Sequence, residues 1–429
     1  MASLAGIEPR HVLLESFHAA VAAADPLKIV PPHLPEPPRG KTLVVGAGKA
    51  AASMALAVEN HWPSERALSG VVITRYGHGL TTNRIRVIEA GHPVPDESGA
   101  AAAHEILASV QGLTEDDLLI ALISGGGSSL LSLPAEGVSM AGLKEVTRQL
   151  LMCGAPIQEI NTVRKHLSLI LGGRLAANCS ARTLALAISD VTGDDPTHIA
   201  SGPCAPDPST YHEAIAVLAK YSVDAPAEVM GHLDAGARGA KPETPKPGDR
   251  VFDRVESRVI ATAHRSLEAA AEVFRARGIT PVILGDSITG EAREVGKVMA
   301  AIAREARLHG SPCRPPLALI SGGECTVTVR AGGRGGRCSE FLLSLGVELD
   351  GLKGVHAIAA DTDGIDGSES NAGALLGPDS LQRASSAGLN PKELLARNDT
   401  WRFFSDLHDL VVTGPTLTNV NDYRAIVVI

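Results

Sequence analysis

Two loops combine glycines with hydroxyl or charged side chains directly after a run of apolar residues. They are Ser124–Ser129 (Ser-Gly-Gly-Gly-Ser-Ser) and Ser321–Glu324 (Ser-Gly-Gly-Glu). Such glycines let consecutive backbone N–H groups converge on an anion. The apolar runs before them, 118–123 and 317–320, are typical of strands buried on both faces of a parallel sheet. Ligands bind at the carboxyl ends of such strands, so we expect two halves of one anion-binding site. The predicted binding residues are Ser124, Gly125, Gly126, Gly127, Ser128, Ser129, Gly322, Gly323 and Glu324.

A third glycine turn carries a lysine. Gly46, Gly48 and Lys49 follow an apolar segment and precede an alanine-rich one, in a pattern that fits the G-x-G-x-x-G/A dinucleotide fingerprint. No acid stands near the end of the next predicted strand to bind a ribose hydroxyl, but Arg75 there would suit the 2′-phosphate of NADP. Lys49 adds a positive charge where a helix N-terminus already favours anions, which indicates phosphate binding. The alternative is a tight turn with a solvated lysine.

Acidic residues gather directly after two further predicted strands. Asp190, Asp194 and Asp195 form one group, and Asp361, Asp363 and Asp366 form the other. Carboxylates bind Mg²⁺ together with substrate phosphates, and a carboxylate can also take the proton of a hydroxyl nucleophile. Aspartates are also common turn residues, so this alternative stays open. We predict Asp190 as catalytic and Asp194, Asp361 and Asp363 as metal ligands.

Two arginines are candidates for binding an anion. Arg337 follows the glycine-rich loop 332–336, and its planar guanidinium suits the charge on a phosphoryl group in transfer. Arg164 lies in the run Thr162–His166, whose consecutive side chains fan out around a helix. Such a run is by itself typical of a solvated helix face. An exposed basic loop is the corresponding alternative for Arg337.

Composition limits the class of protein. The 429 residues suggest two domains, and the α/β alternation predicts a Rossmann-like parallel sheet in residues 1–240 and a smaller α/β domain in residues 250–429, with the active site in the cleft. The net charge of −9, without a basic stripe, argues against nucleic acid. Six scattered cysteines, no signal-peptide pattern and no long apolar stretch predict a cytoplasmic protein without a membrane segment.

The ordered motifs resemble the glycerate 2-kinase family, whose second domain is called MOFRL. The resemblance extends over nearly the whole chain and is carried by 44–50, 89–93, 124–129, 160–166, 189–195, 201–203, 321–324, 362–367 and 413–422. It implies a two-domain α/β fold, with catalytic roles for Lys49 and Arg337. Where family members commonly have Asn-Gln, this chain has Cys338-Ser339.

The resemblance also implies a reaction. Family members transfer a phosphoryl group from ATP to glycerate, so we expect ATP and Mg²⁺ as cofactors and phosphorylation of the 2-hydroxyl of D-glycerate. Arg164, within one of the shared motifs, is predicted to bind substrate or nucleotide. Because some members are named hydroxypyruvate reductase, NADPH-dependent reduction of hydroxypyruvate is the alternative activity, and a non-catalytic binding protein is a third possibility. A homo-oligomer is compatible with the sequence.

Overall fold

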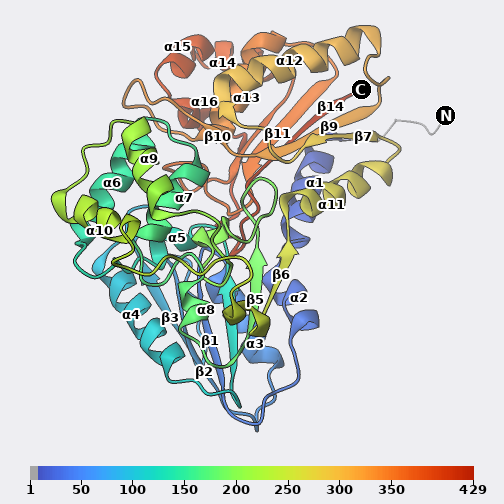
Figure 1. The fold of residues 1–429 in the computed structure, drawn as a ribbon. Helices are drawn as coiled ribbons and strands as arrows, with labels where there is room; N and C mark the ends of the chain where they lie inside the picture. Colours follow the sequence, from blue (N-terminus) through green and yellow to red (C-terminus); the bar gives the residue numbers. More distant parts are fainter. Residues whose placement is uncertain (1–7) are drawn as a thin grey trace. The chain divides into compact units, whose positions relative to one another are not determined.

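The computed structural model describes residues 8–429, which divide into two compact units (Figure 1). Residues 26–260 form the unit called here the Rossmann unit. Residues 8–25 pack with 261–429 as the mixed-sheet unit. Residues 1–7, part of the segment from which we predicted no signal peptide, lie outside the described residues. None of the helices in residues 8–429 is both long and apolar enough to cross a membrane.

The Rossmann unit is built on a six-stranded sheet with the strand order β3-β2-β1-β4-β5-β6. The first five strands are paired in parallel, as the apolar runs predicted. Every residue of β1 and of β4 is buried, because helices cover both faces of the sheet. The strands are β1 Thr42–Ala47, β2 Leu68–Arg75, β3 Ile85–Ala90, β4 Leu118–Ile123, β5 Arg182–Ile188 and β6 Val255–Ala261.

A group of helices in this unit has a hydrophobic core of its own. The group consists of α6, α7, α9 and α10, which lie together in Figure 1. Leu150, Val163, Leu218 and Leu233 are among the side chains that fill this core. The helices of the unit are α2 Pro26–Ile29, α3 Ala51–His61, α4 Glu97–Gln111, α5 Gly127–Leu130, α6 Met140–Met152, α7 Ile157–His166, α8 Arg174–Ala177, α9 Tyr211–Lys220 and α10 Ala227–Ala237, with 3₁₀ turns at Pro31–His33, Ile199–Ser201 and Arg250–Arg254.

The mixed-sheet unit contains a six-stranded sheet with the order β13-β12-β11-β14-β9-β7. Only β7 and β9 are parallel neighbours; β14 runs antiparallel to both β9 and β11. Its strands are β7 Thr280–Gly285, β9 Leu317–Gly323, β11 Val355–Asp361, β12 Gly373–Leu376, β13 Leu410–Val411 and β14 Asp422–Val428, and the short β8 Gly290–Glu291 and β10 Cys325–Thr326 pair separately. Its helices are α1 Pro9–Ala22, α11 Ala263–Arg275, α12 Ala292–His309, α13 Arg337–Leu349, α14 Ser380–Ser386, α15 Pro391–Ala396 and α16 Thr400–Asp406. The chain is therefore an α/β protein with one parallel and one mixed sheet.

The boundaries of the units differ from the predicted domains 1–240 and 250–429. Helix α1 belongs to the mixed-sheet unit, because Phe17 and its neighbours pack against Phe274 of α11 and Tyr423 of β14. Strand β6, expected to open the second domain, is instead the sixth strand of the Rossmann sheet. The short strand β10, which follows β9 in the chain, pairs in parallel with β8.

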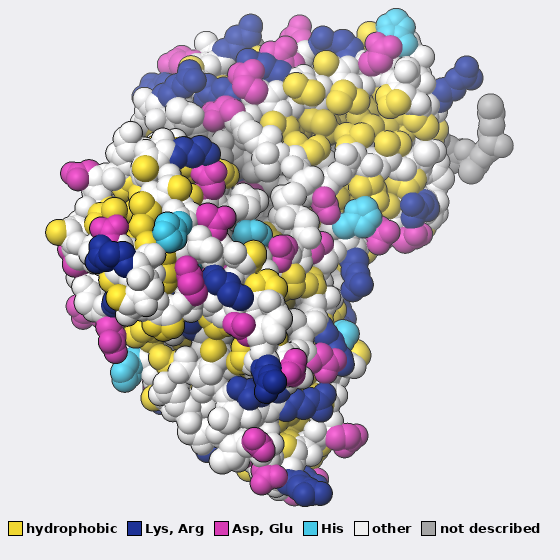
Figure 2. Space-filling view, in the orientation of Figure 1, with side chains coloured by type: hydrophobic (Ala, Val, Ile, Leu, Met, Phe, Trp, Pro, Cys, Tyr) yellow, Lys and Arg dark blue, Asp and Glu magenta, His cyan; other side chains and the backbone are white. Residues whose placement is uncertain are grey.

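Charged side chains on the face seen in Figure 2 are mixed in sign. Figure 2 shows Lys and Arg interspersed with Asp and Glu over the visible face. This arrangement agrees with the net charge of −9 and with the absence of a basic stripe from the sequence.

A buried carboxylate fastens the start of β3 to helix α3. Glu59 accepts hydrogen bonds from the backbone N–H groups of Asn83 (2.7 Å), Arg84 (2.8 Å) and Ile85 (3.1 Å) and from the Asn83 amide (3.1 Å). Burial alone would raise the pKa of Glu59, but these donors lower it below its ordinary value of 4.5.

We expect Glu59→Gln to lower the free energy of unfolding by about 1–3 kcal/mol at pH 7, because the donors lose a charged acceptor. A depressed folded pKa contributes stability above the unfolded pKa, and that contribution disappears as the pH falls through the folded pKa. The difference between variant and wild type in urea unfolding should therefore shrink below pH 4.5. The exposed Glu65→Gln variant is the control. A difference that stays constant down to acidic pH would contradict this role of the carboxylate.

Candidate functional site

Two of the predicted glycine loops lie against each other in the Rossmann unit. Strands β1 and β4 are parallel neighbours at the point where the strand order reverses, and their carboxyl ends lead into Gly46–Lys49 and Ser124–Ser129. The Lys49 N–H donates to the Gly125 carbonyl (2.9 Å), and the Ala50 N–H donates to Ser124 Oγ (3.0 Å). Doubly wound sheets bind their ligands in this crevice, at the topological switch point.

Glycine is required where the two loops meet. A Cβ on Gly48, whose φ is +139°, would lie 2.1 Å from Ser124 Oγ, and a Cβ on Gly46 would lie 2.2 Å from the Leu122 carbonyl oxygen. Gly126 adopts φ +82°, and a Cβ added there would lie 2.7 Å from Nε2 of the His92 ring. These glycines thus serve close packing of the two loops as well as access of a ligand to the backbone.

A chain of side-chain hydrogen bonds fixes the end of the Ser124–Ser129 loop. Ser128 Oγ lies 2.8 Å from Ser201 Oγ, which donates to Asn161 Oδ1 at 3.0 Å. Ala200 and Ser201 have φ of +49° and +58°, conformations that L side chains rarely adopt. Strain of this kind persists only where the surrounding structure imposes it, and it often marks functional sites. Asn161 and Ser201 therefore position Ser128.

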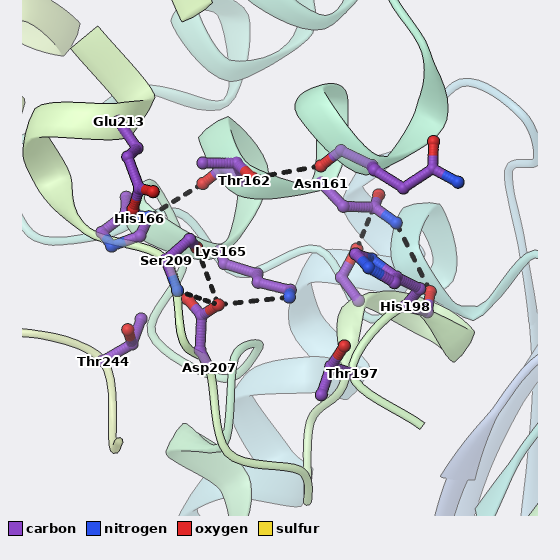
Figure 3. Close-up of polar contacts among 12 residues, drawn as sticks. Asn161, Thr162, Lys165, His166, Thr197, His198, Asp207, Ser209, Glu213 and Thr244 are labelled. Atoms are coloured by element: carbon purple, nitrogen blue, oxygen red, sulfur yellow. Dashed lines mark hydrogen bonds and ion pairs between the residues drawn. The ribbon is translucent and has the colours of Figure 1, made fainter. Parts of the chain in front are cut away.

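The side chains of the run Thr162–His166 fan out around α7, as predicted. The expected solvated face is wrong for two of these side chains. Lys165 forms a buried ion pair with Asp207 at 3.3 Å (Figure 3). His166 is also buried, and its Nε2 lies 3.1 Å from Glu243 Oε2. Burial alone would raise the pKa of Asp207, but Lys165 and Ser209 hold it below its usual range. Burial also lowers the pKa of His166. These pairs hold α7 in place, so the direction of Arg164 is fixed.

Arg164 points into a cavity of about 420 Å³. The cavity is lined by the segment 93–95, the end of α5, helix α6 and Arg164 itself, among others. Within residues 8–429, the guanidinium of Arg164 has neither an ion-pair partner nor a hydrogen-bond partner. Burial lowers the pKa of its guanidinium to about 10, which leaves it charged at neutral pH. Ser128 and Ser129 of the glycine loop line the same cavity.

The acidic loop after β5 lies in the Rossmann unit with these groups. Asp190, partly buried, follows β5 directly, and β5 is the neighbour of β4 in the sheet. Asp194 has φ +54° and is also partly buried. Asp195 accepts the Thr197 N–H (2.8 Å), a turn contact of the kind that the alternative interpretation predicted.

In the mixed-sheet unit, Arg337 begins helix α13 and lies among three carboxylates. Its Nε donates to Asp422 Oδ1 (2.8 Å), Nη2 donates to Asp361 Oδ2 (2.5 Å), and Nη1 lies 3.3 Å from Glu324 Oε1. Burial alone would lower the pKa of Arg337, but these carboxylates raise it well above its usual value. Asp422 also accepts a hydrogen bond from the buried Arg424 (2.8 Å). Arg337 is therefore a mostly buried, paired side chain, and the alternative of an exposed basic loop is wrong.

The other predicted residues of this unit surround the same cluster. Gly322 and Gly323 end β9 beside the start of β14, and Glu324 follows them. Asp363 accepts the Ile365 N–H (2.9 Å), while its own N–H donates to Asp361. Asp366 is buried and accepts the N–H groups of Cys338 and Ser339 (both 2.9 Å), so it caps α13. Both side chains of the Cys338-Ser339 pair are fully buried.

The predicted metal ligands are divided between the units. Asp194 belongs to the Rossmann unit, whereas Asp361 and Asp363 belong to the mixed-sheet unit. No group of three or more His, Cys, Asp or Glu within residues 8–429 is arranged to hold a metal ion. Both oxygens of Asp361 accept hydrogen bonds, from Arg337 and from the Asp363 N–H. The surroundings of Asp361 fit a guanidinium rather than a metal ion.

Sequence comparison places this architecture among known proteins. Residues 12–234 match a domain of unknown function (DUF4147), and residues 317–422 match the MOFRL family. The chain is 38% identical to a D-glycerate 2-kinase of Thermotoga maritima, over 96% of this chain and 97% of the relative. The chain belongs to the glycerate 2-kinase family. This membership confirms the resemblance found in the sequence motifs.

Two further comparisons agree with the family. A crystal structure of a glycerate kinase from Thermotoga maritima superposes with a TM-score of 0.86 at 37% identity, covering 98% of this chain and 99% of that chain. An Agrobacterium vitis protein named putative hydroxypyruvate reductase is 52% identical over 98% of this chain and 95% of its own length. Similar proteins thus carry both names, glycerate 2-kinase and putative hydroxypyruvate reductase, that the family resemblance led us to expect.

Sequence reasoning missed several residues of the site. Asp422, which shares Arg337 with Asp361, lay in a motif but was given no role. Asn161 and Ser201, which position Ser128, were likewise only parts of motifs. An available signal was that each lies in one of the stretches shared with the family. Their side-chain partners are distant in sequence and become apparent only in the fold.

Proposed function

We propose that this protein is a glycerate 2-kinase, which transfers the γ-phosphoryl group of ATP to the 2-hydroxyl of D-glycerate. The observation that supports this most strongly is the meeting of Lys49 and the Ser124–Ser129 loop at the switch point of the Rossmann sheet. Backbone donors and a lysine at that position suit an anionic phosphate chain. The family membership supports the same reaction class.

The proposed roles follow the charges of the reaction. The 2-hydroxyl oxygen attacks the γ-phosphorus, the bond to the β-phosphate oxygen breaks, and ADP leaves. Asp190 takes the hydroxyl proton, while Lys49 and Arg337 stabilise the charge on the transferring phosphoryl group. Gly46, Gly48 and the N–H groups of 125–127 hold the phosphates, and Gly322, Gly323 and Glu324 contribute to binding. Because no step needs a covalent enzyme intermediate, positioning and electrostatics supply the catalysis.

Magnesium is proposed to arrive with the nucleotide. It neutralises phosphate charge when bound, and it needs only one or two protein carboxylates. Asp194, in the Rossmann unit with the glycine loops, is the carboxylate that we propose for it, and Asp363, in the mixed-sheet unit, stays a prediction. Asp361 is assigned instead to holding Arg337, which revises its predicted role as a metal ligand.

The proposed reaction is tested by product analysis. Purified protein with ATP, Mg²⁺ and D-glycerate should release ADP and form 2-phosphoglycerate, identified by ³¹P NMR against the 3-phosphate. A parallel assay follows NADPH oxidation with hydroxypyruvate. The reductase alternative merits this assay because Gly46–Ala51 leads from β1 into α3 and Arg75 is the last residue of β2, the two positions that an NADP site would use. NADPH oxidation without any phosphorylated product would replace the kinase proposal with the reductase alternative.

A further inference from the structure

The cavity beside Arg164 has the size and lining of a site for an amphipathic anion. Its volume of about 420 Å³ lies within the range of about 300–1,000 Å³ found for sites of drug-sized ligands. Most of its wall is apolar, formed by Pro93, Pro95, Leu133, Leu143, Leu151 and Leu171. Such a wall stabilises a flat heterocycle by excluding water from it.

The lining of the cavity also carries a positive charge that an anionic ligand would neutralise. Arg164 lines it and forms no ion pair within residues 8–429, whereas Lys144, which also lines it, interacts electrostatically with Asp96. Arg148 at the rim is already paired with Glu145 (2.6 Å), so it does not need a ligand. A partly buried cation without a partner favours an anion, because pairing offsets the cost of its desolvation.

These two properties distinguish between the two substrates of the proposed kinase. Glycerate is a three-carbon acid with hydroxyl groups on two carbons, and it has almost no apolar surface to bury against six aliphatic side chains. A nucleotide has a flat base at one end and phosphates at the other. Because Ser128 and Ser129 line the cavity and directly follow Gly125–Gly127 in the chain, a phosphate end held near these serines would lie toward those glycines.

We propose that this cavity, between the segment 93–95, α6 and Arg164, is the nucleotide site, with the base among the leucines and the phosphates near Arg164 and the glycine loop. The assignment rests on the proposed kinase function and adds the location of the nucleotide. It makes the length and lining of α6, which provides Ala141, Lys144 and Leu151, a determinant of nucleotide affinity.

The first test fills the cavity. Ala141 is exposed on α6 and lines the cavity, so Ala141→Trp should block it without disturbing the core. We expect binding of ADP, measured by calorimetry without glycerate, to weaken at least about 10-fold. The KM for ATP should rise in parallel while the KM for glycerate stays unchanged. Met152→Trp, an exposed position of the same helix outside the lining, is the control and should bind ADP as the wild type does.

The second test removes the cation. Arg164→Met should weaken ADP binding about 10–100-fold, the loss expected for a charge-assisted hydrogen bond. Its Tm should not fall, because no partner is left unpaired. Unchanged ADP binding in both variants would overturn the assignment, as would an increase confined to the KM for glycerate. ADP binding that Ala141→Trp blocks, in a protein that forms no phosphoglycerate, would support the nucleotide site and contradict the kinase proposal.

Discussion

Replacing Lys49 with alanine is expected to lower kcat about 10²–10³-fold, comparable to the loss of one preorganised donor at a site of developing charge. Lys49 lies in the turn between β1 and α3, with its backbone tied to Gly125 of the neighbouring loop. Its place is therefore set by two strand ends rather than by a flexible surface segment. A positive charge held there stabilises the phosphoryl group most when negative charge shifts in the transition state.

The measurement is steady-state kinetics with ATP and D-glycerate, accompanied by urea unfolding. Lys49→Arg should retain part of the activity because it keeps the charge but not the geometry. Lys41→Ala is the matched control, since this exposed lysine precedes the same strand at its other end. Near wild-type turnover of Lys49→Ala with unchanged stability would remove Lys49 from the catalytic residues.

The sequence was sufficient for the first five strands of the Rossmann unit, β1 to β5, because local signals agreed with each other. Fully apolar runs such as 118–123 predicted strands buried on both faces, and each ended at a glycine or acidic loop. The Gly46–Lys49 turn and the Ser124–Ser129 loop were therefore placed at strand ends from sequence alone. Their contact with each other depends on the strand order, which the motifs did not contain.

The unit boundary was harder to predict because composition was misleading. Residues 234–250 are rich in Gly, Pro, Lys and Glu, which is typical of a linker. In the fold, however, Glu243 accepts the Tyr211 N–H (3.0 Å), and the Pro245 carbonyl accepts the Asp207 N–H (2.8 Å). These specific contacts keep the segment on the Rossmann unit and lead the chain into β6. A polar segment with buried partners cannot be distinguished from a free one by its composition.

The sequence predicted which residues belong to the candidate site, but not which of their side chains form ion pairs with each other. Arg337, Asp361 and Glu324 were each predicted, but as separate contributors to phosphate, metal and ligand binding. The antiparallel strand β14 brings Asp422 beside Asp361, and Arg337 then lies between them. This pairing depends on a contact between residues more than eighty positions apart, for which no local pattern exists. Arg164 differs from Arg337, because the fold leaves its guanidinium without a paired carboxylate, and no local sequence pattern predicts that either.

Replacing Arg337 with methionine is expected to cause two losses at once. The carboxylates of Asp361 and Asp422 are almost fully buried, and removal of the guanidinium leaves both of them without it. Breaking a buried charge pair on one side costs about 3–5 kcal/mol, so urea unfolding should show a decrease of that size. The kinase activity should also fall below detection, because the proposed charge on the phosphoryl group is lost.

A second substitution separates the two effects. In Arg337→Met/Asp361→Asn, one unpaired charge is removed, so part of the lost stability should return while the activity should not. Arg334→Met is the matched control in the same loop: Arg334 is 54% exposed and stacks on Trp401, so its loss should cost less than about 1 kcal/mol and leave kcat unchanged. Recovery of activity together with stability in the double variant would make Arg337 a structural residue. In that case neither the guanidinium of Arg337 nor the negative charge of Asp361 would be needed for the reaction.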